Sequence, residues 1–172
     1  MKTFKEKVAV ITGAGSGMGR YLAVLLAKDG ADVCICDVNQ ETLDETAEML
    51  RKYNVSVSSH LLDVSDKESI ESLPQKVIDH HGKIDLVFNN AGVTTGSHFK
   101  DMEEENWNWV MGINFDGVIN STRAFIPHMI DRPEAAIVNT SSIFGMVAVP
   151  GQSVCHATKF AVRGFTLSLI HI

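Results

Sequence analysis

Short apolar runs alternate with longer segments of helical period along the whole 172-residue chain. Runs of strand length occupy residues 7–12, 31–37, 55–63, 83–90 and 135–142. Segments in which apolar residues recur every three or four positions follow these runs, at 19–30, 40–53, 65–82, 103–129 and 152–172. The pattern therefore predicts a β-α unit that is repeated five times.

The predicted strands have the composition of strands that are buried on both sides. Residues 8–11 and 86–88 are continuously apolar rather than alternating, which is typical of a parallel sheet covered by helices on both faces. Each crossover is long enough for a right-handed β-α-β unit. No repeat or linker interrupts the series, so we expect one domain with a doubly wound α/β sheet. Such sheets bind ligands beyond the carboxyl ends of their strands.

Local signals for helix ends agree with these boundaries. Ser65 and Glu68 have the spacing of a capping box at the start of the third helix. Gly30 and Gly82 stand where glycines commonly end helices. Pro74 lies inside the third predicted helix and is expected to kink or divide it.

The charge of the chain excludes two classes of partner. There are 15 Lys and Arg against 21 Asp and Glu, a formal net charge of −6, and no basic cluster. Nucleic acids and anionic membrane surfaces both require a basic face, so neither is expected as a partner. The first 15 residues lack the apolar core of a signal peptide, and no stretch approaches the roughly 20 apolar residues of a membrane span. We expect a cytoplasmic protein.

Cysteines and histidines give no sign of a disulfide framework or a metal centre. Cys34, Cys36 and Cys155 are too few and too unevenly placed for a framework, and the first two lie in an apolar run. We expect them to be small core residues. The histidines are scattered, and the pair at positions 80 and 81 ends a predicted helix, so no metal site is expected.

A glycine-rich stretch, ITGAGSGMGR, joins the first strand to the first helix. Glycines there allow a tight turn and the close approach of a pyrophosphate, and the helix N-terminus offers N–H groups to its charge. The spacing G-x-G-x-x-G fails in both registers, because its last position is Met18 when counted from Gly13 and Arg20 when counted from Gly15. The spacing T-G-x-x-x-G-x-G fits residues 12–19. A plain turn remains the alternative for this stretch alone. The candidate cofactor-binding residues are Gly13, Gly15, Ser16, Gly17, Met18 and Gly19.

An acid follows at the end of the second strand. Asp37 lies about 20 residues beyond the loop, where a carboxylate accepts hydrogen bonds from an adenosine ribose. It would repel a 2′-phosphate, and neither Arg nor Lys stands beside it, so NAD is favoured over NADP. The alternative role for Asp37 is a favourable charge at the start of the next helix.

Taken together, the motifs resemble those of the short-chain dehydrogenase/reductase family. They appear in order as TGAGSGMG at 12–19, Asp37, DV at 63–64, NNAG at 89–92, the asparagine of GINFDGV, and VNTSS followed by CHATK at 138–159. The resemblance runs from about residue 6 to the end of the chain. It implies a Rossmann-type α/β sheet with strand order 3-2-1-4-5 in a single NAD(P)-binding domain, residues 1–172.

The resemblance also assigns cofactor contacts position by position. Asp63 and Val64 would hold the adenine, and Lys159 would bind the nicotinamide ribose. The residues that would line the cofactor channel beside the fourth strand are Asn90, Ala91 and Gly92.

The family's reaction moves a hydride between nicotinamide and a carbonyl carbon while a general acid/base handles the proton on the oxygen. Asn114 would hold a water of the proton relay, and Ser142, preferred over Ser141 from its spacing to position 155, would hydrogen-bond the substrate oxygen. Asn114 shares an apolar stripe of its helix, so its amide should be buried and hydrogen-bonded. Each residue also has a purely structural alternative. Asn114 would then be a hydrogen-bonded structural amide, Ser142 a solvent-facing turn serine and Lys159 a solvated helix lysine.

One departure from the family concerns the general acid. The family usually has a tyrosine four positions before the lysine, and this chain has Cys155. A thiol has a suitable unperturbed pKa of about 8.5, but its sulfur falls short of a phenol oxygen by the length of a ring. Because proton transfer needs a contact of about 2.6–3.2 Å or one bridging water, we expect hydride transfer to be severely impaired while cofactor binding survives. A nucleophilic Cys155 is disfavoured, since His156 points about 100° away around the helix.

The second departure concerns the end of the sequence. The chain stops within an apolar helical stretch, residues 164–172, without a cap or turn residues. Family members usually continue with two more strands and a segment that forms much of the substrate pocket. We expect a form that is incomplete at its C-terminus and lacks those strands. The remaining pocket walls, residues 93–99 and 143–151, are mainly apolar and favour a non-ionic substrate.

The sequence leaves three functions open. The first is an NAD(P)-dependent oxidoreductase that acts on an alcohol/carbonyl pair. The second is a catalytically inactive NAD-binding protein. The third is an interaction module, because family members often pair through the two long helices represented here by residues 103–129 and 152–172. The chain would then assemble with itself or with an intact relative, and a homo-oligomer through these two helices is the expectation.

Overall fold

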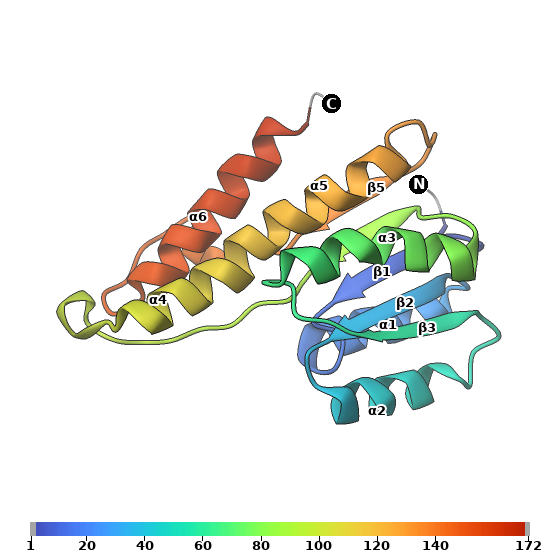
Figure 1. Ribbon diagram of the computed structural model, residues 1–172, viewed down its shortest axis with the longest axis horizontal. Helices are drawn as coiled ribbons and strands as arrows, with labels where there is room; N and C mark the ends of the chain where they lie inside the picture. The colour runs from blue at the N-terminus through green and yellow to red at the C-terminus, as the bar shows by residue number, and fades with distance from the viewer. Residues whose placement is uncertain (1–2, 171–172) are drawn as a thin grey trace.

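The computed structural model describes residues 3–170 and contains one parallel sheet (Figure 1). Its strands are β1 (Val8–Thr12), β2 (Asp32–Asp37), β3 (Val57–Leu61), β4 (Leu86–Asn89) and β5 (Ala136–Asn139). They pair in the order β3-β2-β1-β4-β5. The predicted strand order and the doubly wound arrangement are therefore confirmed.

Helices cover both faces of this sheet. They are α1 (Gly17–Lys28), α2 (Gln40–Leu50), α3 (Lys67–His81), α4 (Glu104–Met111), α5 (Gly117–Met129) and α6 (Ser153–Ser168). Short turns of other helix types are η1 (Phe99–Asp101), η2 (Gly112–Asp116) and η3 (Ile143–Gly145). Figure 1 shows α1 and α2 on one side of the sheet and α3, α5 and α6 on the other.

The core consists of two apolar layers that share the central strand. All five residues of β1 are buried, which is why the run VAVIT carries no polar alternation. On one face Val10 packs in a cluster with Val77 and Phe125, below α3 and α5. On the other face Ile11 packs with Leu26 and Leu43, below α1 and α2. Burial on both faces explains the continuously apolar strands.

The cysteines behave as predicted from the sequence. Cys34 and Cys36 are fully buried on β2, with their Sγ atoms 4.0 Å apart, and Cys155 is 4 % exposed. Within residues 3–170, no group of three or more His, Cys, Asp or Glu side chains could hold a metal ion. In the same range, no helix is long and apolar enough to cross a membrane.

Helix ends match the predicted positions, with two corrections in α3. Gly30 and Gly82 have φ of 88° and 77°, the left-handed conformation that glycine adopts without strain. The capping box was wrong: Asp66 caps α3, because its carboxylate accepts from the backbone N–H of Glu68 (3.1 Å) and Ser69 (3.4 Å). Pro74 does not divide α3, which runs unbroken for 15 residues.

A buried carboxylate ties the starts of two strands together. Asp85 is 2 % exposed and accepts hydrogen bonds from Val8 N (2.9 Å) and from Arg132 Nη2 (2.6 Å). Lys83 Nζ lies 3.3 Å from the same carboxylate. Burial raises the pKa of Asp85, but the Val8 hydrogen bond and the two cations outweigh burial and hold the pKa below its usual value.

Candidate active site

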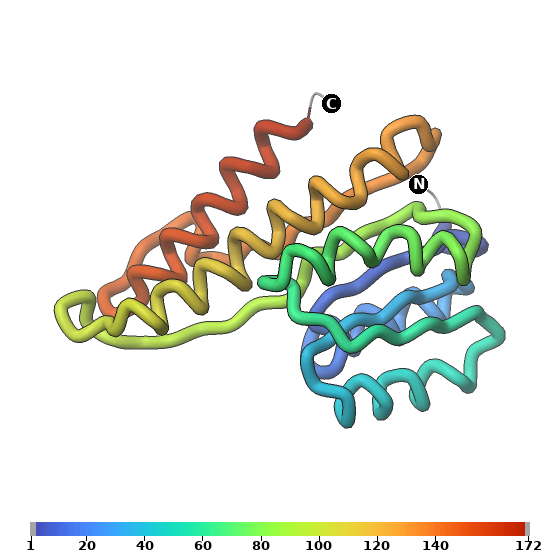
Figure 2. The backbone as a smooth tube through the Cα atoms, viewed as in Figure 1, coloured from blue at the N-terminus to red at the C-terminus, as the bar shows by residue number. Residues whose placement is uncertain are grey.

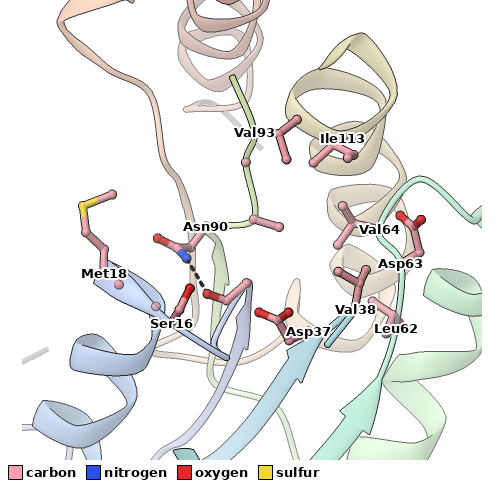
Figure 3. A pocket seen from close by; sticks show the side chains of 15 residues that line it. Ser16, Met18, Asp37, Val38, Leu62, Asp63, Val64, Asn90, Val93 and Ile113 are labelled. Atoms are coloured by element: carbon pink, nitrogen blue, oxygen red, sulfur yellow. Dashed lines mark hydrogen bonds between the residues drawn. The ribbon is translucent and has the colours of Figure 1, made fainter. Parts of the chain in front are cut away.

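A cleft of about 350 Å³ opens beyond the carboxyl ends of β1, β2 and β4 (Figure 3). It contains every cofactor-binding residue predicted from the sequence except Gly15 and Lys159. The lining residues are Gly13, Ser16, Gly17, Met18, Gly19, Asp37, Val38, Leu62, Asp63, Val64, Asn90, Ala91, Gly92, Val93 and Ile113. Residues from four separate β-α connections thus meet in one place, as this topology requires.

Glycine is required at two positions of the loop for different reasons. Gly13 has φ of 65°, and a Cβ there would lie 2.8 Å from Ala91 Cα. Gly19 lies in α1, where a Cβ would lie 2.1 Å from Gly13 O. Asn90 crosses from β4 to the same turn, since its Nδ2 donates to Thr12 O (3.0 Å) and Gly13 O (3.2 Å) (Figure 3). The loop is therefore closely packed against the start of α1 and the end of β4.

The first turn of α1 is available to an anion. Ser16 is the N-cap residue in an extended conformation, and its side chain makes no capping hydrogen bond. The first turn contains no acidic residue. Ser16, Gly17 and Met18 all line the cleft, so the positive end of the helix dipole lies at its edge. This arrangement fits a pyrophosphate group.

Asp37 stands at the opposite side of the loop. Its Oδ2 accepts from Gly15 N (2.8 Å) and its Oδ1 from Asn39 N (3.1 Å). A Cβ on Gly15 would lie 2.7 Å from Asp37 Cγ, so only glycine permits this approach. Gly15 is buried behind the cleft wall, where it positions the carboxylate. Asn39, and not Asp37, caps α2 with its side chain.

Sequence reasoning missed the role of Arg20, which holds the loop from behind. Its Nε donates to Gly15 O and to Thr46 Oγ1, each at 2.9 Å. Its Nη2 donates to Thr42 O (3.1 Å) and forms an ion pair with Glu45 at 2.7 Å. A cation in the first turn of a helix is repelled by the positive end of the helix dipole, so it needs partners elsewhere. The position of Arg20 in the sequence was therefore the signal that could have indicated a structural role.

The far end of the cleft is an apolar slot between strand ends. Leu62 and Val64 are 5 % and 7 % exposed, while Val38 is 64 % exposed at the rim. Asp63 lies between the two buried residues, and its Oδ1 accepts from Ser65 N (2.8 Å) and Ser65 Oγ (2.7 Å). Sequence reasoning missed Val38 and Leu62, each adjacent to a predicted site residue, as well as Val93 and Ile113.

Asn114 is buried and hydrogen-bonded, as predicted. It lies in η2, a π-helical turn between α4 and α5, and is 1 % exposed. Its Oδ1 accepts from Val93 N and its Nδ2 donates to Val93 O, both at 2.8 Å. Single π turns inside α-helices are common at functional sites. Here the turn places an amide against the chain that leaves β4.

Lys159 lies beside the same segment. Its Nζ donates to Thr140 O (2.8 Å), just beyond β5. A Cβ on Gly92 would lie 3.3 Å from Asn114 Oδ1 and 3.8 Å from Lys159 Nζ, so the three residues meet at one point. Burial lowers the pKa of the Lys159 ammonium, and its electrostatic interaction with Cys155 acts in the opposite direction.

Cys155 lies on the face of α6 that contacts the segment after β4. Its Sγ is 3.0 Å from Thr94 Oγ1 and 3.8 Å from Thr95 O. The side chain packs with Val110 and Val154 in a small apolar cluster. The sulfur is thus occupied by local contacts and almost fully covered.

The two serines after β5 have different environments. Ser142 is exposed, and its Oγ accepts from Phe144 N (3.2 Å) at the start of η3. The Oγ of Ser141 donates to Lys159 O (3.0 Å) and ties β5 to α6. The structure brings Asn114 and Lys159 together around Gly92. Ser142 makes no direct hydrogen bond to Asn114, Cys155 or Lys159 in the described part of the chain.

Known proteins resemble this chain over nearly all of its length. The family model described as short chain dehydrogenase matches residues 7–171. The oxidoreductase SadH of Mycobacterium tuberculosis is 43 % identical over 98 % of this chain and 61 % of SadH. The 3-oxoacyl-acyl-carrier-protein reductase FabG of Thermotoga maritima is 38 % identical over 93 % of this chain and 65 % of FabG.

Solved structures agree with these sequence matches. A short-chain dehydrogenase/reductase of Burkholderia phymatum, in complex with NAD, superposes with a TM-score of 0.96 and 38 % identity, over 99 % of this chain and 61 % of the other. An NAD⁺-bound xylitol dehydrogenase gives a TM-score of 0.93 and 30 % identity, over 97 % of this chain and 65 % of the dehydrogenase. The chain thus spans less than two thirds of the length of each of these four proteins. It belongs to the short-chain dehydrogenase family of oxidoreductases.

Proposed function

We propose that this chain binds NAD in the cleft, on a scaffold for hydride transfer between nicotinamide and an alcohol or carbonyl compound. The observation that carries the proposal is the convergence of an open helix N-terminus, an acid and an apolar slot in one cleft of about 350 Å³. The Burkholderia phymatum protein, with which the chain shares its fold, has been crystallised with NAD. Both lines of support concern the nucleotide, and the substrate is a separate question.

Each part of the cleft suits one part of a dinucleotide. The N–H groups at the start of α1 would bind the pyrophosphate, as helix N-termini do in this fold. Val38, Leu62 and Val64 offer an apolar slot for the adenine. Asp37 Oδ1 and Oδ2 would accept hydrogen bonds from the adenosine ribose. At the other end, the Lys159 ammonium beside Gly92 would donate to the nicotinamide ribose.

The electrostatics of the cleft favour NAD over NADP. The Asp37 carboxylate lines the cleft at the end of β2, where a 2′-phosphate would meet its negative charge. Arg20 follows the glycine loop, but its guanidinium is bound to Gly15 O and Glu45. It would have to break these contacts to neutralise a phosphate.

The catalytic step is impaired in this proposal because the proton donor is badly placed. Bound nicotinamide would supply the hydride acceptor or donor, and a protein group must move the proton of the substrate oxygen. Ser142, which is exposed, would bind that oxygen, and Lys159 would bind the ribose. Cys155 is 4 % exposed and its Sγ lies 3.0 Å from Thr94 Oγ1, so the side chain is too short and too covered to reach a carbonyl.

Calorimetric titration tests the nucleotide proposal. We expect saturable binding of NAD to the chain and at least tenfold weaker binding of NADP. Asp37→Asn should reduce this preference at least tenfold, since it removes the negative charge that faces the 2′-phosphate. Asp44→Asn, an equal change of charge on the exposed face of α2, is the matched control. Absence of a binding signal for NAD would overturn the proposal.

A second candidate function is an interaction module. Trp109 on α4 and Phe160 on α6 are 48 % and 44 % exposed, and exposed aromatic residues on helices are common in protein interfaces. The two long helical segments would then pair with a second copy. Light scattering on the sample used for calorimetry separates the alternatives: an oligomer that binds no NAD supports the module, and NAD binding without turnover supports the impaired enzyme.

A further inference from the structure

His156 follows directly after Cys155, the residue that occupies the position of the family's tyrosine. Histidine is the commonest general acid/base in enzymes, so His156 is a candidate to replace the missing phenol. The alternative is a structural anchor that supports the site without touching a substrate. The contacts of the imidazole ring decide between these two roles.

Both ring nitrogens of His156 lie against the backbone of the segment between β5 and α6. Nδ1 is 3.0 Å from Phe144 O, and Nε2 is 2.9 Å from Val149 N. The Phe144 ring stands 4.6 Å from the imidazole, centroid to centroid, and His156 is 8 % exposed. Figure 2 shows this segment, in orange, running along the first turns of α6. Neither nitrogen is therefore available to a substrate oxygen, and His156 does not replace the tyrosine.

These contacts fix where the ring carries its proton. A carbonyl oxygen only accepts, so Nδ1 must donate to Phe144 O, and a backbone N–H only donates, so Nε2 must accept from Val149 N. Val149 O also lies 3.2 Å from Nε2, but it could accept only from a protonated Nε2, and Val149 N would then lose its acceptor. The hydrogen bonds thus select the neutral tautomer that is protonated on Nδ1.

The first of these bonds reaches Ser142 through a single residue. Phe144 N donates to Ser142 Oγ at 3.2 Å, while Phe144 O accepts from His156. Both backbone polar groups of Phe144 are thus used, one toward each side chain. The next residue, Gly145, lies so close to α6 that a Cβ would be 2.7 Å from Lys159 O. The turn η3 is therefore packed onto the helix, and its position determines where Ser142 Oγ lies relative to Lys159.

A second anchor holds this turn on α6 independently of the imidazole. Arg163 Nη1 donates to Gly145 O at 3.3 Å. Loss of the His156 ring should therefore leave the turn attached to α6 but allow residues 142–149 to move. A substitution at His156 then changes the position of the turn without unfolding the protein.

We propose that His156 is a positioning residue of the candidate active site: as a neutral imidazole protonated on Nδ1, it holds Phe144 and thereby fixes the hydroxyl of Ser142. The inference rests on the proposed function, in which Ser142 binds the substrate oxygen. It assigns His156 no proton of the reaction. Its physical basis is that a displacement of about 1 Å at a reacting group can cost roughly 100-fold in rate.

NMR of the full chain with ¹⁵N-labelled histidine tests the tautomer. The signals of His156 are identified by their disappearance in His156→Leu. At neutral pH we expect a protonated Nδ1 and an unprotonated Nε2. A protonated Nε2 at that pH, with or without a proton on Nδ1, would overturn the inference.

Two substitutions at His156 separate positioning from general stability. The amide of asparagine can replace Nδ1 as a donor to Phe144 O, whereas leucine offers no polar group. We expect Ser142 to keep a single side-chain rotamer, measured by its three-bond couplings, in the unsubstituted chain and in His156→Asn, and to populate several rotamers in His156→Leu. His128→Leu, at an exposed histidine of α5, is the matched control and should leave Ser142 unchanged. A Ser142 that is as well ordered in His156→Leu as in His156→Asn would overturn the inference.

The kinetic consequence is measured in chains that also carry Cys155→Tyr, in which NADH formation from a secondary alcohol should be fast enough to follow. There His156→Leu should lower kcat about tenfold or more with unchanged NAD affinity, and His156→Asn should restore most of the rate. Equal kcat values for the two His156 variants would contradict the inference. Absence of NAD binding, or of turnover in Cys155→Tyr itself, would instead overturn the proposed function, and the couplings of Ser142 would still decide the role of His156.

Discussion

Gly19→Ala adds one methyl group at the closest backbone approach between α1 and the glycine-rich loop that follows β1. Gly19 lies in the first turn of α1 and is buried beneath the turn that begins at Gly13. The new Cβ would stand 2.1 Å from Gly13 O and 2.6 Å from Asn90 Nδ2. Ordinary contacts begin near 3.4 Å, so the loop and the helix must separate by more than 1 Å.

The expected loss follows from two opposing effects. Overpacking of this kind costs about 1–3 kcal/mol, whereas Ala in place of Gly inside a helix contributes about 1 kcal/mol. We expect the free energy of unfolding to fall by up to about 2 kcal/mol. Because the N–H groups that would bind the pyrophosphate move with the loop, we also expect NAD affinity to fall at least tenfold.

Urea unfolding and calorimetric titration with NAD measure the two effects. Gly164→Ala is the matched control, since Gly164 is also helical, in α6, and a Cβ there would meet no atom within 4 Å. That variant should gain up to about 1 kcal/mol of stability and keep its NAD affinity. If both variants behave alike in stability and in NAD binding, the argument from close packing of the loop is refuted.

Two further predictions concern buried polar groups. Asp85 has a pKa below its usual value, so its contacts stabilise the fold above about pH 4 and are lost as the pH falls through the lowered value. Urea unfolding at neutral pH and at acidic pH should show this loss, and the loss should be smaller in Asp85→Asn, in which only the other carboxyl groups with lowered pKa, such as Asp66, still contribute. Asn114→Ala leaves Val93 N and Val93 O without their partners, and it should lower the free energy of unfolding by about 2 kcal/mol or more. An Asn114→Ala variant as stable as the original in the same assay would contradict this account.

The architecture could be predicted because one physical requirement controls it. Strands covered on both faces must be apolar at consecutive positions, and that pattern is visible in the residues of β1 and β4. The location of the cleft followed, since ligands of such sheets bind at the carboxyl ends of the strands. Asn114 was also predictable, because an amide within an apolar helical stripe must find partners inside the protein.

Details that depend on three-dimensional contacts could not be predicted. Ser65 and Asp66 are adjacent candidates for one helix cap, and only the backbone path shows that Asp66 reaches two N–H groups. Pro74 leaves α3 undivided, and its helical neighbours Leu73 and Val77 pack in the core cluster with strand residues such as Val10. Spacing also could not show that Gly15 lies behind the cleft wall, where it accommodates Asp37 rather than a ligand.

The central claim is that the chain retains a nucleotide site but has lost effective proton transfer at position 155. Its most direct test compares NADH formation from a secondary alcohol by the unsubstituted chain and by Cys155→Tyr, both saturated with NAD. Because a positioned general acid/base contributes roughly 10²–10⁴ in rate, the account predicts at least a 100-fold gain for Cys155→Tyr with unchanged NAD affinity. Equal rates for the two proteins, with NAD bound to both, would contradict it.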